Sequence, residues 1–427
     1  MLSEHSRIIL LFKSPKQLFL MQIQEKAHRI LRQPVCDSCL GRQFAQLLSG
    51  YTNVQRGHLL RTLVAMSIDQ EDYFGDLDLS NFHGFNFHKL DAKNIEKKKC
   101  SVCEGIFDTL EKIAGKVAKA ANKCEFSTFL IGTKLSFDLI SREENLWETV
   151  GIDYCEPIKA ELNREIGKLV EKKTKAIFNS NPDVNLVIDI PEGKADVQIN
   201  PLFVYGEYQK LIRGIPQTRW PSKKYKTSIE EIMAKPFLIA TKGKSSKLHG
   251  LGREDIDARC LGWRPFVLEI LEPRTRKLNL PALTKKVGKG IKIRNLRVSN
   301  IAEVRRIKEE RADKTYKATV ICENISRDDL KKLSKLVGSI KQKTPERVLH
   351  RRADKFRHRK LKTLKATFMN KKKFSMTVKC EAGLYVKELI SGDNGRTTPS
   401  VSSILGQACL CKELDVLEIH NEKIKKK

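Results

Sequence analysis

Apolar residues in the first hundred positions follow helical spacing only in short stretches. In the stretch Pro15–Gln33 they recur as on one face of a helix, at Leu18, Met21, Ile30 and Leu31. A second helix is expected over Gly41–Leu48. The stretch Ser67–Lys99 is rich in Asp, Asn, His and Lys, so it predicts a loop-rich insertion.

The next hundred residues alternate between helical and strand patterns, which predicts an α/β module of modest size. Helices are expected over Phe107–Ala121 and Pro157–Lys172. Strands are expected over Phe126–Ile131, closed by Gly132, over Asn185–Ile190, stopped by Pro191, and over Val197–Tyr205.

Beyond a Pro- and Arg-rich stretch, Arg213–Pro221, that predicts a hinge, strand patterns dominate. The expected strands are Pro236–Thr241, Pro265–Leu271, Tyr316–Cys322 and Phe374–Cys380, and the expected helices are Asn300–Arg311 and Arg327–Leu336. This pattern predicts an α+β domain with a mostly antiparallel sheet. Lys423–Lys427 forms a basic tail, which is expected to fray.

The charge balance points to a polyanionic partner. The 427 residues include 81 Lys and Arg against 51 Asp and Glu, a formal net charge of +30. Nucleic acid is the foremost candidate, with an anionic membrane surface or a merely solvated basic surface as alternatives. The apolar run Ile8–Phe12 is too short to span a membrane and has no cleavage site after it, so we expect an intracellular, cytoplasmic protein.

Four of the eleven cysteines form two pairs, Cys36/Cys39 and Cys100/Cys103, each with two residues between the thiols. Such pairs can each supply one edge of a tetrahedral zinc site, and a closed site of four cysteines is structural. Gly41 and Gly105 follow the pairs by the same step, which suits a turn that brings amides to the sulfurs. A redox pair and unpaired buried thiols are the alternatives, and the other cysteines are expected in the core.

The segment His249–Arg259 combines two glycines with flanking arginines and acids. Glycine permits close backbone approach to a ligand, and arginines keep a neighbouring carboxylate ionised. An ionised, oriented carboxylate can act as a nucleophile. A surface turn with salt bridges would look the same, so the segment alone names no reaction.

Gly252-Arg253-Glu254-Asp255 resembles the Gly-Arg-Thr-Asp motif of the pseudouridine synthase superfamily, whose members share the Asp. The last half of the chain resembles one branch, the archaeal and eukaryotic tRNA pseudouridine(54/55) synthases. The stretches that carry this likeness are Arg213–Pro221, Arg264–Glu269, Thr344–Asp354, Gly383–Glu388 and Gly392–Pro399. The paired cysteines and the region around Phe129–Gly132 resemble the family's zinc-containing, THUMP-like accessory domain.

The resemblance implies an α+β fold in three parts. A helical zinc-binding segment (1–105) and a THUMP-like α/β RNA-binding domain (106–222) precede a pseudouridine synthase catalytic domain (223–427) with a mostly antiparallel mixed sheet. Two departures from the family pattern stand out. The stretch Ser222–Lys226 has no cysteines, so no second metal is expected, and Leu384 stands where a Thr is common.

Catalytic roles carry over from the resemblance. Asp255 is assigned as the nucleophile, with Asp257 as its rival two residues on. Tyr316 resembles the strand tyrosine that stacks on the target base. Lys387 resembles the cation that pairs with the catalytic Asp, and Tyr385 would share its face on an extended strand.

Substrate-binding residues are expected around this centre: Arg253, Tyr385, Leu405, Arg347, Arg351, Arg352 and Arg396. Leu405 resembles the apolar floor of the family's pocket, although a plain core leucine fits equally. The basic run 347–360 would follow RNA phosphates, or would form a solvated basic helix. Arg213, Arg219 and Trp220 are further candidates for RNA contact, and Trp220 could instead fill a domain junction.

The resemblance implies isomerisation of uridine to pseudouridine in the T-loop of tRNA, at position 55 with 54 as a second candidate. The target base would be flipped into a pocket. The sequence contains no dinucleotide-binding or Walker A loop, so the chemistry is expected to need no cofactor and zinc to be structural. The T-arm is the expected partner, with no membrane. A non-catalytic RNA-binding protein and a different THUMP-bearing tRNA enzyme are the competing classes.

Overall fold

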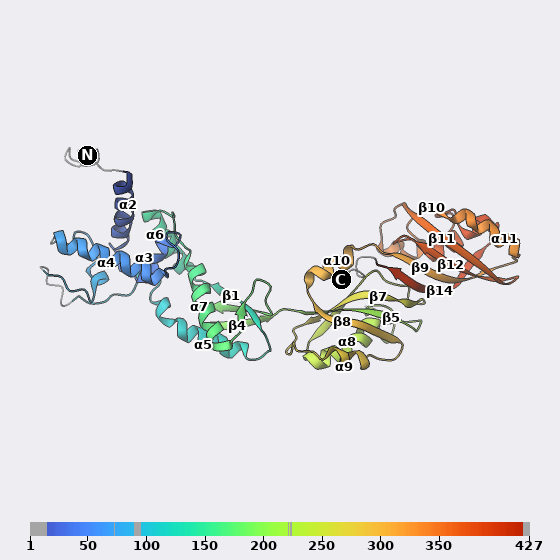
Figure 1. The fold of residues 1–427 in the computed structure, drawn as a ribbon, viewed down its shortest axis with the longest axis horizontal. Coiled ribbons are helices and arrows are strands. Elements are labelled where there is room, and N and C mark those ends of the chain that lie inside the picture. The colour runs from blue at the N-terminus through green and yellow to red at the C-terminus, as the bar shows by residue number, and fades with distance from the viewer. Residues whose placement is uncertain (1–14, 72, 89–94, 221, 223, 422–427) are drawn as a thin grey trace. The chain divides into compact units, whose positions relative to one another are not determined.

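The computed structural model describes residues 15–71, 73–88, 95–220, 222 and 224–421, without the side chains of 15–21 and of residue 351. The predicted basic tail, the apolar run Ile8–Phe12 and the side chains of Leu18 and Met21 therefore lie outside the description. The chain divides into two compact units, residues 1–199 and 200–427. Figure 1 shows their elements in chain order.

A small mixed sheet and a set of helices build the first unit. The strands lie in the order β2-β1-β3-β4, with β1 parallel to both β2 and β3 and antiparallel pairing between β3 and β4. They span β1 (Thr128–Lys134), β2 (Ile177–Phe178), β3 (Val184–Asp189) and β4 (Lys194–Ile199). The helices are α2 (Pro15–Ile30), α3 (Asp37–Gly41), α4 (Asn53–Glu71), α5 (Leu110–Ala121), α6 (Phe137–Val150) and α7 (Ile158–Thr174), with the 3-10 turns η1 (Arg42–Phe44), η2 (Leu79–Phe82) and η3 (Ile106–Thr109).

The predicted helix over 41–48 is wrong, and α4 was missed. The chain is helical before position 41, in α3, and continues only through the short turn η1. Gly57 and Arg61 occupy the buried face of α4. The apolar residues of this helix therefore do not recur at regular helical spacing, and the sequence pattern did not predict it. Arg61 is buried because its guanidinium donates to Asp37 Oδ1 at 2.8 Å and to the carbonyl oxygen of Val35 at 2.7 Å. After α4, the described residues of the polar stretch, 73–88 and 95–99, are largely irregular, as predicted.

Helices α3 and α4 cross at two glycines. A Cβ on Gly41 would lie 1.8 Å from the carbonyl oxygen of Asn53, and one on Gly57 would lie 2.0 Å from that of Asp37. Gly41 therefore permits close helix packing and does not form the turn expected of it. Gly105 does adopt the left-handed region, with a φ of 84°.

The second unit is built on one ten-stranded sheet in the order β13-β10-β11-β12-β9-β14-β7-β5-β8, with β6 also paired to β7. Among the described strands every neighbouring pair is antiparallel except β14 and β7, which run parallel. The strands are β5 (Leu202–Lys210), β6 (Ser245–Gly250), β7 (Arg259–Leu271), β8 (Ile291–Ser299), β9 (Asp313–Cys322), β10 (Gly338–Gln342), β11 (Arg357–Asn370), β12 (Lys373–Cys380), β13 (Thr397–Thr398) and β14 (Cys409–His420). The α+β prediction with a mostly antiparallel mixed sheet is confirmed.

Short helices cover this sheet (Figure 1). They are α8 (Ile229–Thr241), α9 (Leu280–Lys285), α10 (Ile301–Glu309), α11 (Arg327–Lys332), α12 (Val386–Ser391) and α13 (Val401–Leu405), with the 3-10 turns η4 (Leu333–Leu336) and η5 (Glu346–Arg351). Separate apolar clusters lie under α8 and α9, under α10, and under α11 to α13. No helix among the described residues combines the length and the apolar character that crossing a membrane requires.

Two strand predictions are wrong for local reasons. The apolar run 236–241 belongs to helix α8, because Ser228 caps its first turn by accepting a hydrogen bond from the Glu231 amide and because Ile229, Met233 and Phe237 bury one face. The single strand expected over 197–205 is two strands in different sheets. Gly132 lies inside β1 and does not close it. Residues 200–222, grouped with the accessory module in the sequence analysis, contribute β5 to the large sheet.

The crossing of α3 and α4 yields a stability prediction. Gly57→Ala should lower the free energy of unfolding by about 1–3 kcal/mol, because the added methyl group must displace the backbone of Asp37. Urea unfolding of the full chain measures the change. Gly115→Ala in α5 is the matched control: its Cβ meets nothing within 4 Å, so the variant should be as stable as the wild type or gain up to about 1 kcal/mol. Equal stability of the two variants would contradict the close crossing.

Candidate active site

The Gly-Arg-Glu-Asp segment forms the loop between β6 and β7, and buried donors hold its main chain. Lys210, which is fully buried, donates from Nζ to the carbonyl oxygens of Ile256 at 2.8 Å and Asp255 at 3.3 Å. Arg213 donates to the carbonyl oxygen of Asp257 at 2.8 Å. Because these donors come from β5 and the residues after it, they tie the loop to the sheet.

Glu254 anchors the same loop from within. Its side chain is 1% exposed and lies 3.1 Å from Nε of Arg264, which is fully buried on β7. The Tyr208 hydroxyl donates to the Glu254 carboxylate at 3.2 Å, and Gln217 donates to the Tyr208 oxygen at 2.9 Å. Burial raises the pKa of Tyr208 well above its usual value, so the phenol remains a donor. The next residue of the loop, Asp255, lines a cavity beside this anchored pair.

Two cations flank the Asp255 carboxylate. Arg347 donates to Oδ1 at 3.1 Å, and Lys387 Nζ lies 3.5 Å from Oδ2. Arg347 is itself held by Glu388, whose Oε1 accepts from Arg347 Nε at 2.6 Å. The two cations hold one carboxylate oxygen each and so orient the side chain. The Asp255 side chain stays 32% exposed, which leaves it accessible from the cavity.

The rival Asp257 has the shorter contacts with Lys387, at 2.7 and 2.8 Å. Although its partial burial opposes the shift, the hydrogen bond from Lys387 holds the pKa of Asp257 below its usual value. Its side chain is 67% exposed and does not line the cavity that contains Tyr316. The two carboxylates differ in position: Asp255 lines the cavity that contains Tyr316, and Asp257 does not.

The cavity beside Asp255 has a volume of about 490 Å³, within the range of about 300–1,000 Å³ typical of small-ligand pockets. Tyr316 lines it from β9, and burial raises the pKa of its phenol, which keeps the proton at neutral pH. Tyr385 lines it as well, and its hydroxyl accepts a hydrogen bond from Arg352 at 2.7 Å. Leu414 and Val416 of β14 contribute apolar wall.

An adjoining cavity of about 430 Å³ shares Arg253, Asp255, Arg347 and Lys387 with the first. Trp220 and Tyr225 line it, with their ring centroids 5.6 Å apart in an edge-to-face arrangement. The two cavities therefore adjoin at Asp255. Tyr316 lines the first cavity, and the aromatic pair lines the second.

The structure gathers most of the predicted site residues around these cavities, with some differences in local structure. Asp255, Tyr316, Lys387, Arg253, Tyr385, Arg347 and Arg352 all line the first cavity. The segment expected to be extended there is a turn at Gly383, with a φ of 90°, followed by helix α12, which carries Lys387. The basic run 347–360 comprises η5 and the start of β11, not a helix.

Other predicted residues lie elsewhere. Leu405 packs against the apolar cluster under α11 to α13 and does not line the cavity. Arg396 donates to the carbonyl oxygen of Thr344, and Arg213 to Asp415 at 2.6 Å, so both brace the fold. Arg219 lies 3.8 Å from Glu231 on the surface. The side chain of Arg351 falls outside the described part of the chain.

Sequence reasoning missed several residues of the cavity. Arg347 was predicted as a substrate-binding residue, and only its contact with Asp255 was not predicted. Lys314 lines the cavity, and its place two residues before Tyr316 on a strand was a usable signal, because alternate strand residues share a face. Gln217 also lines it, and nothing in the spacing of the sequence marks that contact.

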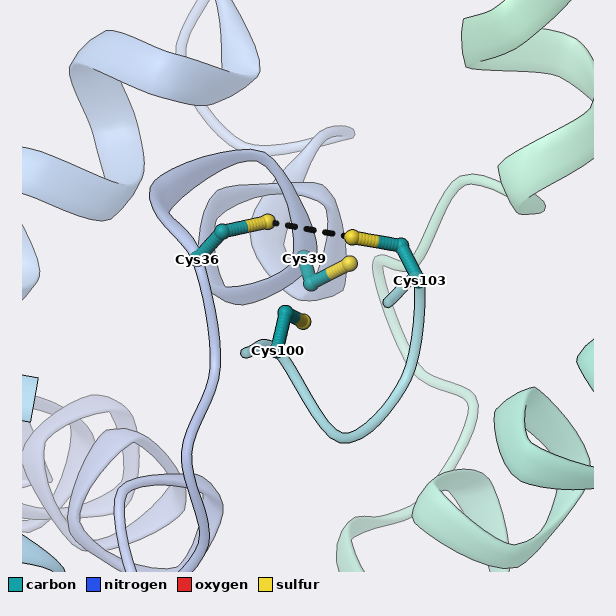
Figure 2. Close-up of side chains that lie close together, drawn as sticks. All are labelled: Cys36, Cys39, Cys100 and Cys103. Atoms are coloured by element: carbon teal, nitrogen blue, oxygen red, sulfur yellow. Dashed lines mark hydrogen bonds between the residues drawn. The ribbon is translucent and has the colours of Figure 1, made fainter. Parts of the chain in front are cut away.

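The four paired cysteines come together in the first unit, as Figure 2 shows. All four sulfurs lie within 4.8 Å of one another, and those of Cys36 and Cys103 are 3.6 Å apart. Zinc–sulfur bonds of about 2.3 Å place tetrahedral sulfurs about 3.8 Å apart, so the cluster fits a metal ion of that kind. Cys39, Cys100 and Cys103 are buried, which also suits a closed structural site.

Arg42 supplies a positive charge beside this cluster. It is fully buried, donates to Cys39 Sγ at 3.8 Å and forms an ion pair with Glu143. Glu143 in turn accepts from the Ile158 amide at 2.7 Å, at the start of α7. Four thiolates around a divalent ion would carry excess negative charge, which this arginine would offset.

Comparison with known proteins agrees with this arrangement. The family model "Pus10, C-terminal" matches residues 203–420, and "Pus10 THUMP domain, archaeal" matches residues 113–189. The tRNA pseudouridine synthase Pus10 of Methanocaldococcus jannaschii is 41% identical, over 92% of this chain and 94% of its own length. That of Pyrococcus furiosus is 39% identical, over 93% and 98%. The chain therefore belongs to the Pus10 family of tRNA pseudouridine synthases.

Proposed function

We propose that this protein isomerises uridine to pseudouridine in the T-loop of tRNA, at position 55 with 54 as a second candidate, and with Asp255 as the covalent nucleophile. One observation carries the proposal: a partly exposed carboxylate flanked by two cations lines a cavity with Tyr316. The T-arm is the proposed partner, bound in part through the THUMP domain.

The reaction requires a flipped-out nucleoside. Tyr316 stacks on the extruded uracil and offsets part of the cost of unstacking, which is a few kcal/mol. An Asp255 oxygen then bonds either to the uracil ring or to the ribose carbon C1′. The C1′–N1 bond breaks, the uracil turns, and C5 bonds to C1′. The Asp255 oxygen is released, C5 loses its proton and N1 gains one. Because product and substrate are isomers, these steps consume no redox partner and no nucleotide.

Arg347 and Lys387 orient the Asp255 carboxylate. Each holds one of its oxygens, and the attacking oxygen is released from its cation as the new bond forms. Each cation also pairs with a second carboxylate, Glu388 for Arg347 and Asp257 for Lys387. This second ion pair keeps the cation beside Asp255. Asp257 and Glu388 are therefore positioning residues in this proposal.

Substitution of Asp255 tests the nucleophile. Asp255→Asn should lower turnover by at least about three orders of magnitude, because the variant lacks a nucleophilic oxygen. Tritium release from tRNA labelled at uridine C5 measures it. Asp257→Asn is the matched control, and we expect a loss of tenfold or less. Undiminished turnover in Asp255→Asn would refute the nucleophile assignment, and reversed effects would make Asp257 the nucleophile. A wild-type protein that releases no tritium would favour a non-catalytic RNA-binding role.

The target position is tested separately. T-loop transcripts that carry uridine only at position 55, or only at 54, should both gain pseudouridine after incubation with the protein, with position 55 modified faster. Carbodiimide mapping of each transcript identifies the product. Modification confined to another arm of tRNA would refute the T-loop assignment without bearing on Asp255.

We further propose that the four-cysteine cluster holds one structural zinc ion. The purified protein should contain about one zinc per chain, and the double variant Cys36→Ser/Cys100→Ser should lose it and unfold at a lower temperature. Metal analysis and calorimetry measure both effects. Cys155→Ser, a cysteine outside the cluster, is the control and should keep the metal. A wild-type protein free of zinc after metal-replete expression would contradict the proposal.

A further inference from the structure

Lys314 presents a buried ammonium group to the active-site cavity. It lies on β9, two residues before Tyr316, so both side chains lie on the same face of the strand. The residue is 9% exposed and lines the 490 Å³ cavity. A Cβ on Gly252, in the loop that carries Asp255, would lie 3.5 Å from Lys314 Nζ. The amine therefore lies beside both the proposed stacking tyrosine and the proposed nucleophile loop.

This ammonium group lacks a close counterion among the described residues. Its one hydrogen bond there is a long one, 3.4 Å, to the carbonyl oxygen of Ala312. The Asp313 carboxylate, on the same strand, pairs with Lys362. The nearby carboxylate of Glu254 pairs with Arg264. A buried cation without a partner is costly, so a fold that keeps one at a cavity indicates a ligand that supplies negative charge.

The groups that face Lys314 come from three strands. Arg264 and Cys260 face it from β7, Cys380 from β12, and Asp313 lies beside it on β9. Burial, with the added repulsion of Arg264, lowers the pKa of Lys314 to about 8. The amine is therefore still mostly protonated at neutral pH, and it becomes neutral in mildly alkaline solution.

Pseudouridine formation places negative charge on the uracil oxygens by either route. If Asp255 bonds to C1′, the C1′–N1 electron pair passes to the ring and spreads onto O2 and O4. If Asp255 adds to the ring at C6, the displaced π electrons pass to O4. In both cases C5 later forms the bond to C1′, the carboxylate is released, C5 loses its proton and N1 gains one. No other co-reactant is consumed.

We propose that Lys314 is a catalytic residue that donates a hydrogen bond to a uracil carbonyl oxygen and stabilises the negative charge that the ring acquires when the glycosidic bond breaks. The proposal rests on the proposed function. Arg347 and Lys387 are less suited to this task, because both are engaged with carboxylates. A preorganised cation in a site sheltered from water gives strong stabilisation of a developing anion.

Leaving-group sensitivity tests the proposal. Single-turnover cleavage of the target N-glycoside is measured on matched T-arm RNAs that carry uridine or 5-fluorouridine, whose fluorine stabilises the ring anion. Lys314→Met should slow cleavage at uridine by about 100-fold or more, within the range for loss of one such donor. The loss at 5-fluorouridine should be tenfold or less, and RNA affinity should change less than threefold. Lys314→Arg should cleave the uridine RNA at least tenfold faster than Lys314→Met does.

Two further readouts separate catalysis from a structural role. Lys314→Met should raise the unfolding temperature, because it replaces an unpaired buried charge with an apolar side chain. The wild-type cleavage rate should fall as the pH rises through about 8, because Lys314 loses its proton, whereas Lys314→Arg should show no such fall. If Lys314→Met does not fold, Lys314→Gln provides the same comparison of the two substrates.

Three outcomes would overturn the proposal. These are full activity of Lys314→Met at uridine, equal losses at uridine and 5-fluorouridine, and a lowered unfolding temperature with a rate loss that Lys314→Arg does not relieve. Asp255→Asn is carried through the same assay. If it cleaves both substrates at the wild-type rate, the nucleophile assignment fails, and that result is distinct from a failure at Lys314.

Discussion

The buried ion pair between Glu254 and Arg264 is the constraint on which the active site depends. Neither group is more than 1% exposed, so the pair is sheltered from water and each partner needs the other. Breaking such a pair costs about 3–5 kcal/mol, because it leaves a buried charge uncompensated. The pair holds the β6–β7 loop against β7, and Asp255, the next residue of that loop, lines the same two cavities as Glu254.

Much of the fold followed from local patterns, and the failures have identifiable causes. In strands such as β12, buried positions alternate with half-buried ones, and β9 follows this pattern over most of its length. The alternation of apolar residues in these sequences therefore predicts the strands. Helix α8 was taken for a strand because its five apolar residues in a row outweighed the capping serine eight positions earlier. Helix α4 was missed because a glycine and an arginine occupy its buried face.

The candidate site residues that lie within short sequence motifs could be predicted. Asp255, Tyr316 and Lys387 do line one cavity, as the resemblance implied. The contact of Arg347 with Asp255 joins positions 92 apart, and no local pattern carries that information. The same limit applies to Gln217 and to the pairing of Lys387 with Asp257, which arises only when α12 is placed against the loop. Sequence thus identified which residue types matter, and tertiary packing decided which of them touch.

The parallel pair β14–β7 has a consequence for the order of assembly. In the large sheet β14 lies between β7, which follows the Asp255 loop, and β9, which carries Lys314 and Tyr316. It is also the last of these strands in chain order. During synthesis the two halves of the cavity therefore leave the ribosome long before the strand that joins them. A nascent chain that lacks β14 would hold both halves of the cavity unjoined, so the cavity is complete only once that strand has inserted.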